Sequence, residues 1–322
     1  MRKALIIGID KYPKNPLRGC CADADSMARM LKKHSNGTPN FDVREIKDVS
    51  TAGQLRGYIR DCFAGEADVA LFYFSGHGYI DEYGGYLVTP DFSQHNYGVT
   101  LQEVLEIANQ SKCKDKIIIL DSCFSGFMGQ LSTKGQRVSE IGEGVTILTS
   151  SKADETSAEV NGRGLLTSLL EEGLAGAAAD VLGNVTPGGL YAYVDKALGP
   201  WGQRPVFKTN VTRFTSLRNV EPQVDICIIR KLDEYFKEMD SLHALDPSYE
   251  WTNAPEIEHE MLEPYANKEH VAIFKELQKL ESIGLVVPVD EDHMYYAAMH
   301  SKACKLTPMG QQYWKLAKEG RI

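Results

Sequence analysis

The sequence lacks a long apolar segment. No uninterrupted apolar run approaches the ~18 residues needed to cross a bilayer. The short apolar run near the amino terminus is interrupted by Asp10 and Lys11, before the hydrophobic region of a secretory signal would be complete. We therefore expect a cytoplasmic protein with no membrane-inserted segment.

Paired cysteines and regularly spaced histidines are also missing. The chain has 7 cysteines, an odd number with no Cys-x-x-Cys pair, and its 8 histidines never recur at the i, i+4 spacing that places two ligands on one helical face. These patterns argue against a disulfide framework and against a zinc site. We expect no metal centre, and a reducing compartment that suits a thiol nucleophile.

What the sequence contains is typical of a globular α/β protein. Its 322 residues are 43% hydrophobic and 25% charged, and this length favours two domains over one. Apolar runs of strand length alternate with segments of helix length, which predicts βαβ units. The predicted strands cover 3–9, 41–46, 68–75 and 116–121, and the predicted helices cover 22–34, 51–63 (capped by Ser50 or Thr51) and 100–110.

A cysteine and a histidine each follow directly on a predicted strand. Cys123 comes after the run 116–121, and His77 comes after the run 68–75. Because parallel strands present their carboxyl ends at one edge of a sheet, both side chains are expected there. A thiol is mostly protonated near neutral pH, and a nearby imidazole makes the thiolate accessible. Alone, either residue would more often be structural; together they predict a nucleophile and its base.

The motifs around these residues resemble those of a known family. Phe74-Ser75-Gly76-His77-Gly78 and Leu120-Asp121-Ser122-Cys123-Phe124-Ser125-Gly126 are similar to the His and Cys motifs of caspase-like clan proteases, and are most similar to bacterial metacaspase relatives. The resemblance covers residues 1–215. It implies a caspase-like Rossmann-type sheet flanked by helices and a cysteine endopeptidase. The catalytic residues would be Cys123 and His77, with backbone N–H groups of Gly78 and Cys123 as the oxyanion hole.

Charge near the predicted nucleophile favours a basic substrate residue. Asp121 lies two residues before Cys123 on the same strand, so the two side chains project to the same face. The resemblance to metacaspase relatives adds Asp23 as a second carboxylate. Such a pair would bind Arg or Lys through charge-assisted hydrogen bonds, which predicts cleavage after those residues. An alternative stays open. Arg18 could resemble the arginine with which caspases bind aspartate, or could pair with Asp23, and Arg204 lies in a region that caspases use for substrate.

The glycine-rich segment 127–144 is expected to be a mobile connection between the two halves of the sheet. Caspase relatives are often cleaved in this connection, so Lys134 and Arg137 are candidate self-cleavage points. A solvated loop that is never cut is an equal alternative.

Many metacaspase relatives bind calcium through clustered carboxylates. After His77 this chain offers Asp81, Glu82 and Asp91, whereas calcium takes six or more oxygen ligands. We therefore expect no required cofactor, and the sequence disfavours calcium dependence without excluding it.

A second domain is predicted after a linker at 216–224. It contains 11 Lys or Arg against 18 Asp or Glu over residues 225–322, a net charge of −7 that disfavours DNA binding. The order helix, hairpin, helix resembles a winged-helix module. The tyrosines near His293 are expected in an aromatic hairpin core, and stacking of these tyrosines and His293 on a nucleotide base is the alternative. The elements expected are a helix carrying Val271, Phe274, Leu277 and Leu280, a hairpin of 285–287 and 294–297, and a last helix capped by Thr307 with Pro308 first.

We expect this second domain to control the protease by binding a partner protein, another copy of the chain or a small nucleotide activator. Bacterial proteins that resemble caspases joined to a sensory domain often act in antiviral defence, which is an analogy only. Two other functions stay open: a catalytically idle scaffold, against which the intact Cys123 and His77 count, and an acidic transcription regulator.

Overall fold

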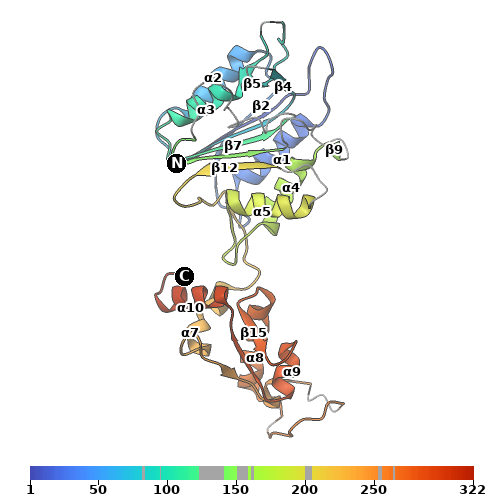
Figure 1. The fold of residues 1–322 in the computed structure, drawn as a ribbon, viewed down its shortest axis with the longest axis vertical. Helices are drawn as coiled ribbons and strands as arrows, with labels where there is room; N and C mark the ends of the chain where they lie inside the picture. The colour runs from blue at the N-terminus through green and yellow to red at the C-terminus, as the bar shows by residue number, and fades with distance from the viewer. Residues whose placement is uncertain are drawn as a thin grey trace. The chain divides into compact units, whose positions relative to one another are not determined.

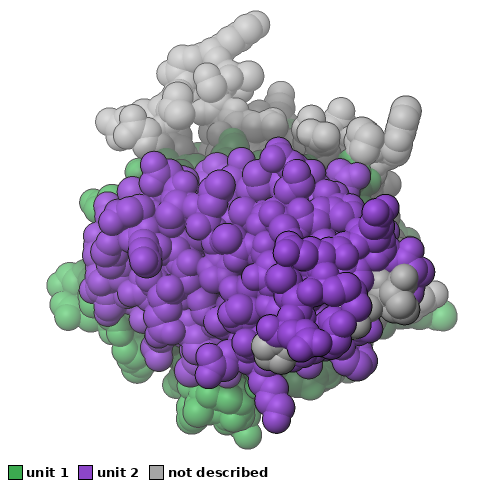
Figure 2. Space-filling model, turned by 90° about the horizontal axis from the view of Figure 1, so that it is seen from below, with its two compact units in different colours: residues 1–221 green, residues 222–322 purple. Residues whose placement is uncertain are grey.

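The chain folds into two compact units, Met1–Glu221 and Pro222–Ile322, coloured separately in Figure 2. The computed structural model describes residues 1–81, 84–94, 96–122, 141–150, 159–160, 163–199, 205–252, 256–263 and 265–322. Each unit is described by itself below.

The first unit is built on a six-stranded sheet with strand order β12-β8-β7-β3-β1-β2. Its strands are parallel except for β12, which pairs antiparallel with β8. The strands are β1 Arg2–Gly8, β2 Asp42–Lys47, β3 Val69–Ser75, β7 Asp115–Asp121, β8 Val145–Thr149 and β12 Val206–Asn210. The predicted parallel α/β sheet is therefore confirmed.

Helices cover both faces of this sheet (Figure 1). The pair α2 Ala52–Phe63 and α3 Leu101–Asn109 lies on one face. The opposite face carries α1 Cys20–Lys32, α4 Leu165–Glu172 and α5 Pro187–Leu198. The predicted cap of α2 is Thr51, whose side chain accepts a hydrogen bond from the backbone N–H of Gln54.

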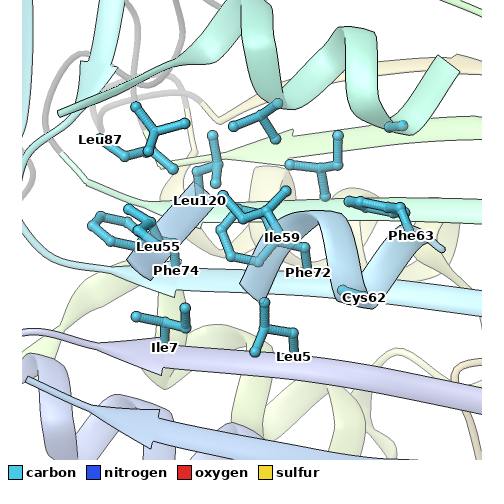
Figure 3. Packing of buried hydrophobic residues seen from close by; sticks show 14 of the residues in the cluster. Leu5, Ile7, Leu55, Ile59, Cys62, Phe63, Phe72, Phe74, Leu87 and Leu120 are labelled. Carbon is cyan, nitrogen blue, oxygen red and sulfur yellow. The ribbon is translucent and has the colours of Figure 1, made fainter. Parts of the chain in front are cut away.

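Two hydrophobic cores form because side chains alternate along each strand. Leu5, Ile7, Phe72 and Phe74 point to the α2 side, where they pack with Leu55 and Ile59 (Figure 3). The alternate residues, such as Ile6 and Tyr73, belong to the core beneath α1, α4 and α5. Burial on both faces explains why these strands are nearly continuous apolar runs.

The strand order places a crevice at the carboxyl ends of the central strands. The direction of the connections reverses between β1 and β3: the chain passes from β1 through α1 to β2 on one side, and from β3 through α3 to β7 on the other. Open α/β sheets bind ligands at such a switch point. The residues that follow β1, β3 and β7 therefore meet at one edge.

A small antiparallel sheet follows His77 and was not predicted. It is formed by β4 Gly78–Asp81, β5 Gly84–Leu87 and β6 Val99–Thr100. Tyr79 of β4 contacts the rings of Tyr86, Phe92 and Tyr97, with ring centroids 6.2, 5.8 and 5.1 Å away. These contacts hold the segment after β5 against the hairpin formed by β4 and β5.

The end of the first unit is fastened to its beginning. Leu217 is buried, and the Arg2 guanidinium donates hydrogen bonds to the carbonyl oxygens of Ser216 and Leu217. The Arg218 side chain donates to the carbonyl oxygens of Leu174 and Lys33. The remaining elements are β9 Glu159–Val160, β10 Arg163–Gly164, a π-helix Gly173–Ala177, β11 Asn184–Val185 and β13 Arg218–Asn219, which pairs with β11.

The second unit has a three-stranded antiparallel sheet with order β14-β16-β15. The last helix begins as predicted, with Thr307 as its cap and Pro308 as its first residue. The elements of the second unit are α6 Ile226–Arg230, α7 Leu232–Tyr235, β14 His243–Ala244, a 3-10 helix Pro247–Tyr249, α8 Lys268–Ser282, β15 Val286–Val289, α9 Met294–Met299, β16 Ala303–Leu306 and α10 Pro308–Lys318.

The predicted hairpin of 285–287 and 294–297 is wrong. β15 pairs with β16, and residues 294–299 form the helix α9 between them. Met294, Ala297 and Ala298 are buried, which is the i, i+3, i+4 spacing of a helix. Tyr296 is 40% exposed, so the expected aromatic hairpin core is absent as well. The winged-helix resemblance stays a prediction.

Across the described part of the chain, none of the helices is both long and apolar enough to span a bilayer.

Candidate active site

His77 lies immediately after β3, where the carboxyl ends of the central strands meet. Its ring Nε2 is 2.6 Å from the carbonyl oxygen of Asn15. A carbonyl oxygen can only accept a hydrogen bond, so Nε2 carries the proton and donates it. In the neutral ring, Nδ1 is then the nitrogen that can accept a proton.

Tyr12 fixes the position of His77. Its hydroxyl accepts a hydrogen bond from the backbone N–H of His77 at 3.0 Å and donates one to the carbonyl oxygen of Val88 at 3.2 Å. The Val88 N–H in turn donates to the carbonyl oxygen of His77. The rings of Tyr12 and His77 have centroids 4.5 Å apart. Burial raises the pKa of Tyr12, which keeps its hydroxyl protonated as a donor.

Cys123 lies outside the described residues, as do the candidate self-cleavage points Lys134 and Arg137. The chain is described up to Ser122, and β7 is paired with β3 up to the partners Ser75 and Asp121. The strand ends that precede the predicted nucleophile and the predicted base are therefore neighbours. Gly78, the other predicted oxyanion-hole residue, begins β4 next to His77.

The two predicted substrate-binding carboxylates are brought together. Asp23 lies in the first turn of α1 and Asp121 ends β7, and their exposed fractions are 1% and 6%. The Asp23 carboxylate accepts hydrogen bonds from the Ser75 hydroxyl and from the N–H of Gly164, at 3.3 and 3.2 Å. The Asp121 carboxylate accepts from the N–H and the hydroxyl of Thr167, at 3.1 and 2.6 Å.

Gly164 is the point on which both carboxylates converge. A Cβ atom at this position would lie 2.1 Å from an Asp121 carboxylate oxygen and 3.2 Å from one of Asp23. Gly164 is also the N-cap of α4, and Thr167 is in the first turn of that helix. The unpaired N–H groups at a helix start favour negative charge. The start of α4 therefore helps to hold two buried carboxylates in one place.

The negative charge of this pair contributes to raised pKa values of two buried groups nearby. Burial, and then the charges of Asp121 and Asp23, raise the pKa of Tyr73 well above its usual value. Burial also raises the pKa of the Cys20 thiol, and the same aspartates contribute. The Tyr73 hydroxyl is 2.5 Å from the Thr167 hydroxyl, which extends the hydrogen bonds of Asp121 into the core. A cationic group would be favoured beside these carboxylates.

A family model described as a caspase domain matches residues 1–191. The chain belongs to the caspase family. The predicted caspase-like protease resemblance is thereby confirmed, and the domain is one of a family of cysteine peptidases. Its closeness to metacaspase relatives stays a prediction.

Two solved structures resemble this caspase-family chain. A protein from Geobacter sulfurreducens is 17% identical with a TM-score of 0.49, over 68% of this chain and 99% of that one. Caspase-1 from Spodoptera frugiperda is 16% identical with a TM-score of 0.49, over 67% of this chain and 91% of that one. No curated protein matches the sequence.

Of the three carboxylates expected near a calcium ion, Asp81 and Asp91 accept hydrogen bonds from the protein and Glu82 lies outside the described residues. Both Asp91 carboxylate oxygens accept hydrogen bonds from the N–H of Ala52, and the Thr89 hydroxyl and Asn96 amide donate to them as well. Asp81 accepts from the N–H of Gly84. Within the described ranges, no group of three or more His, Cys, Asp or Glu side chains could hold a metal ion.

Several residues of this site were missed by sequence reasoning. Asn15 contributes a backbone oxygen, which no side-chain pattern reveals. Gly164 and Thr167 lie in the part of the chain that resembles the family, but no motif or spacing in the sequence indicated a role for either residue. Of the two alternative arginines, Arg18 is exposed, and Arg204 lies outside the described residues.

Proposed function

We propose that this caspase-family protein is a cysteine endopeptidase that cleaves after Arg or Lys, with Cys123 as nucleophile and His77 as general acid and base. The observation that supports this best is the convergence of the buried carboxylates of Asp23 and Asp121 next to the strand ends that precede His77 and Cys123.

The mechanism follows from the chemistry of a thiol and an imidazole. The Cys123 thiol passes its proton to His77 as its sulfur attacks the peptide carbonyl carbon, and His77 then gives this proton to the leaving amine as the C–N bond breaks. His77 then takes a proton from water, whose oxygen attacks the thioester and releases the new carboxyl group. Backbone N–H groups of Gly78 and Cys123 would stabilise the oxyanion. The Asn15 carbonyl, by accepting from Nε2, leaves Nδ1 for these proton transfers.

The proposed specificity follows from charge. A guanidinium or ammonium group entering between Asp23 and Asp121 would gain charge-assisted hydrogen bonds. An acidic side chain would meet two carboxylates of the same sign in a buried environment, which costs several kcal/mol at such sites. Arginine is expected to be preferred over lysine because its planar group can satisfy two carboxylates at once.

Regulation by the second unit is part of the proposal. We infer that residues 225–322 bind a partner protein or a small nucleotide that switches on the protease, in a metacaspase-like role in antiviral defence or cell death. The described cysteines are free thiols, which suits the reducing cytoplasm. Lys134 and Arg137 would be cleaved by the same basic specificity if the enzyme processes itself.

The test is hydrolysis of matched fluorogenic peptides that end in Arg, Lys or Asp. We expect the wild type to cleave Arg and Lys peptides, Cys123→Ala to cleave none, and Asp121→Asn to lose at least tenfold in kcat/KM on Arg peptides. Assays with and without a nucleotide-rich cell extract test the activation. Efficient cleavage of the Asp peptide alone would refute the basic specificity, and silence of the wild type under every condition would favour the scaffold.

A further inference from the structure

A hollow of about 510 Å³ lies against His77 on the described surface of the first unit. One wall is the segment after β1, which includes Tyr12 and Asn15, and the other is the segment after β5, which includes Val88 and Phe92. His77 and Gly78 lie between these walls. The hollow therefore opens directly onto the predicted base and onto one predicted oxyanion-hole residue.

This hollow and the acidic pair lie on opposite sides of the sheet edge. Tyr12 and Val88 belong to the core on the α2 side. Asp23 and Asp121 are held from the other side by α1 and by the start of α4. The hollow, which His77 lines, is thus on one side of this edge of the sheet, and the carboxylates are on the other.

We propose that the hollow is the binding subsite for the residue that follows the scissile bond, and that it accepts a large apolar or aromatic side chain there. This rests on the proposed peptidase function. If the carboxylates bind the residue before the bond, the leaving amine must reach His77 to receive its proton. The chain beyond that amine then continues past His77, away from the carboxylates and into the hollow.

The lining of the hollow decides the kind of side chain. Phe92 is 47% exposed and meets Tyr79 edge-on, with ring centroids 5.8 Å apart. Val88 and Pro90 add apolar surface. Among the described lining residues Lys14 carries the one permanent charge, so a basic side chain would be repelled. An aromatic side chain can pack edge-to-face on Phe92 and bury apolar area on both partners.

The experiment uses internally quenched peptides that differ only in the residue after Arg, which is Phe, Gly or Lys. We expect kcat/KM for the Phe peptide to exceed that for the Gly peptide roughly tenfold, the effect of one well-packed apolar side chain. Phe92→Ala should bring this ratio close to one. Ser93→Trp, which adds bulk at the rim of the hollow, should lower the ratio too. Phe214→Ala, an exposed aromatic packed near Phe207 and Gly188, is the matched control and should leave the ratio unchanged.

Binding separates this subsite from the peptidase function. The same labelled peptides are titrated onto full-length Cys123→Ala protein, with and without Phe92→Ala, and followed by fluorescence anisotropy. Tighter binding of the Phe peptide that depends on Phe92 supports the subsite, even if the wild type cleaves nothing and the peptidase proposal fails. Equal binding and equal turnover of the Phe and Gly peptides would overturn the subsite while leaving the peptidase standing.

Discussion

Thr167→Val is the sharpest test of how the acidic pair is held. Thr167 is fully buried, and its hydroxyl donates to an Asp121 carboxylate oxygen at 2.6 Å while lying 2.5 Å from the Tyr73 hydroxyl. Valine has nearly the same shape, so no cavity forms. The variant loses a charge-assisted hydrogen bond, about 1.5–3 kcal/mol, and takes an acceptor from a buried tyrosine hydroxyl, about 1 kcal/mol. We therefore expect a loss of about 3 kcal/mol in the free energy of unfolding.

The assay is urea unfolding of the full-length protein followed by circular dichroism. Thr167→Ser keeps the hydroxyl and should lose only about 1 kcal/mol for its methyl group. If the peptidase proposal holds, Thr167→Val should also raise KM for Arg peptides more than Thr167→Ser does, because Asp121 loses a positioning partner. A Thr167→Val protein within 0.5 kcal/mol of the wild type, measured beside the serine control, would refute the reasoning.

Two further predictions follow from single side chains. Tyr12→Phe removes the hydroxyl that ties His77 to Val88, so kcat on Arg peptides should fall about tenfold with KM nearly constant; an unchanged kcat in steady-state assays would contradict this. Burial alone would raise the pKa of Asp48, but hydrogen bonds from Lys11 and from the N–H groups of Asp10 and Lys11 lower it to about 2. The contribution of Asp48 to the free energy of unfolding is therefore complete above its unfolded pKa of 3.8 and is lost as pH falls toward 2. At pH 7, Asp48→Asn should lower the free energy of unfolding by roughly 1 kcal/mol after allowance for screening. Urea unfolding should show this difference between variant and wild type shrinking toward zero at the lowest pH where the protein stays folded. A difference that stays constant with pH would refute the prediction.

The sheet was predictable because its strands are buried on both faces. Runs such as Val69–Phe74 leave no doubt about their environment, and the helices between them begin at recognisable caps such as Thr51. The same logic failed for α9. A short segment of mixed aromatic and small residues is compatible with a strand or a helix, and the structure of this segment depends on which of its side chains are buried.

The site was predictable only in part, because its chemistry comes from distant pieces of the chain. Asp23 and Gly164 are hydrogen-bonded across 141 positions, and Asp121 and Thr167 across 46. One sequence cannot show that a glycine is required by two carboxylates that approach it from different elements. The Asn15 oxygen that orients His77 is harder still, since every residue has a carbonyl and only the path of the loop selects this one.

The fastening of residues 216–218 to the start of the chain bears on how the protein may be shortened. The caspase-domain match ends at residue 191, before β12 and before the buried Leu217. A truncation at that point would strip β8 of its antiparallel neighbour and expose a hydrophobic edge that invites aggregation. It would also leave the Arg2 guanidinium without the two carbonyl groups that it binds. A fragment of the first unit that folds on its own must therefore extend through residues 216–218, about 25 residues beyond the end of the caspase-domain match.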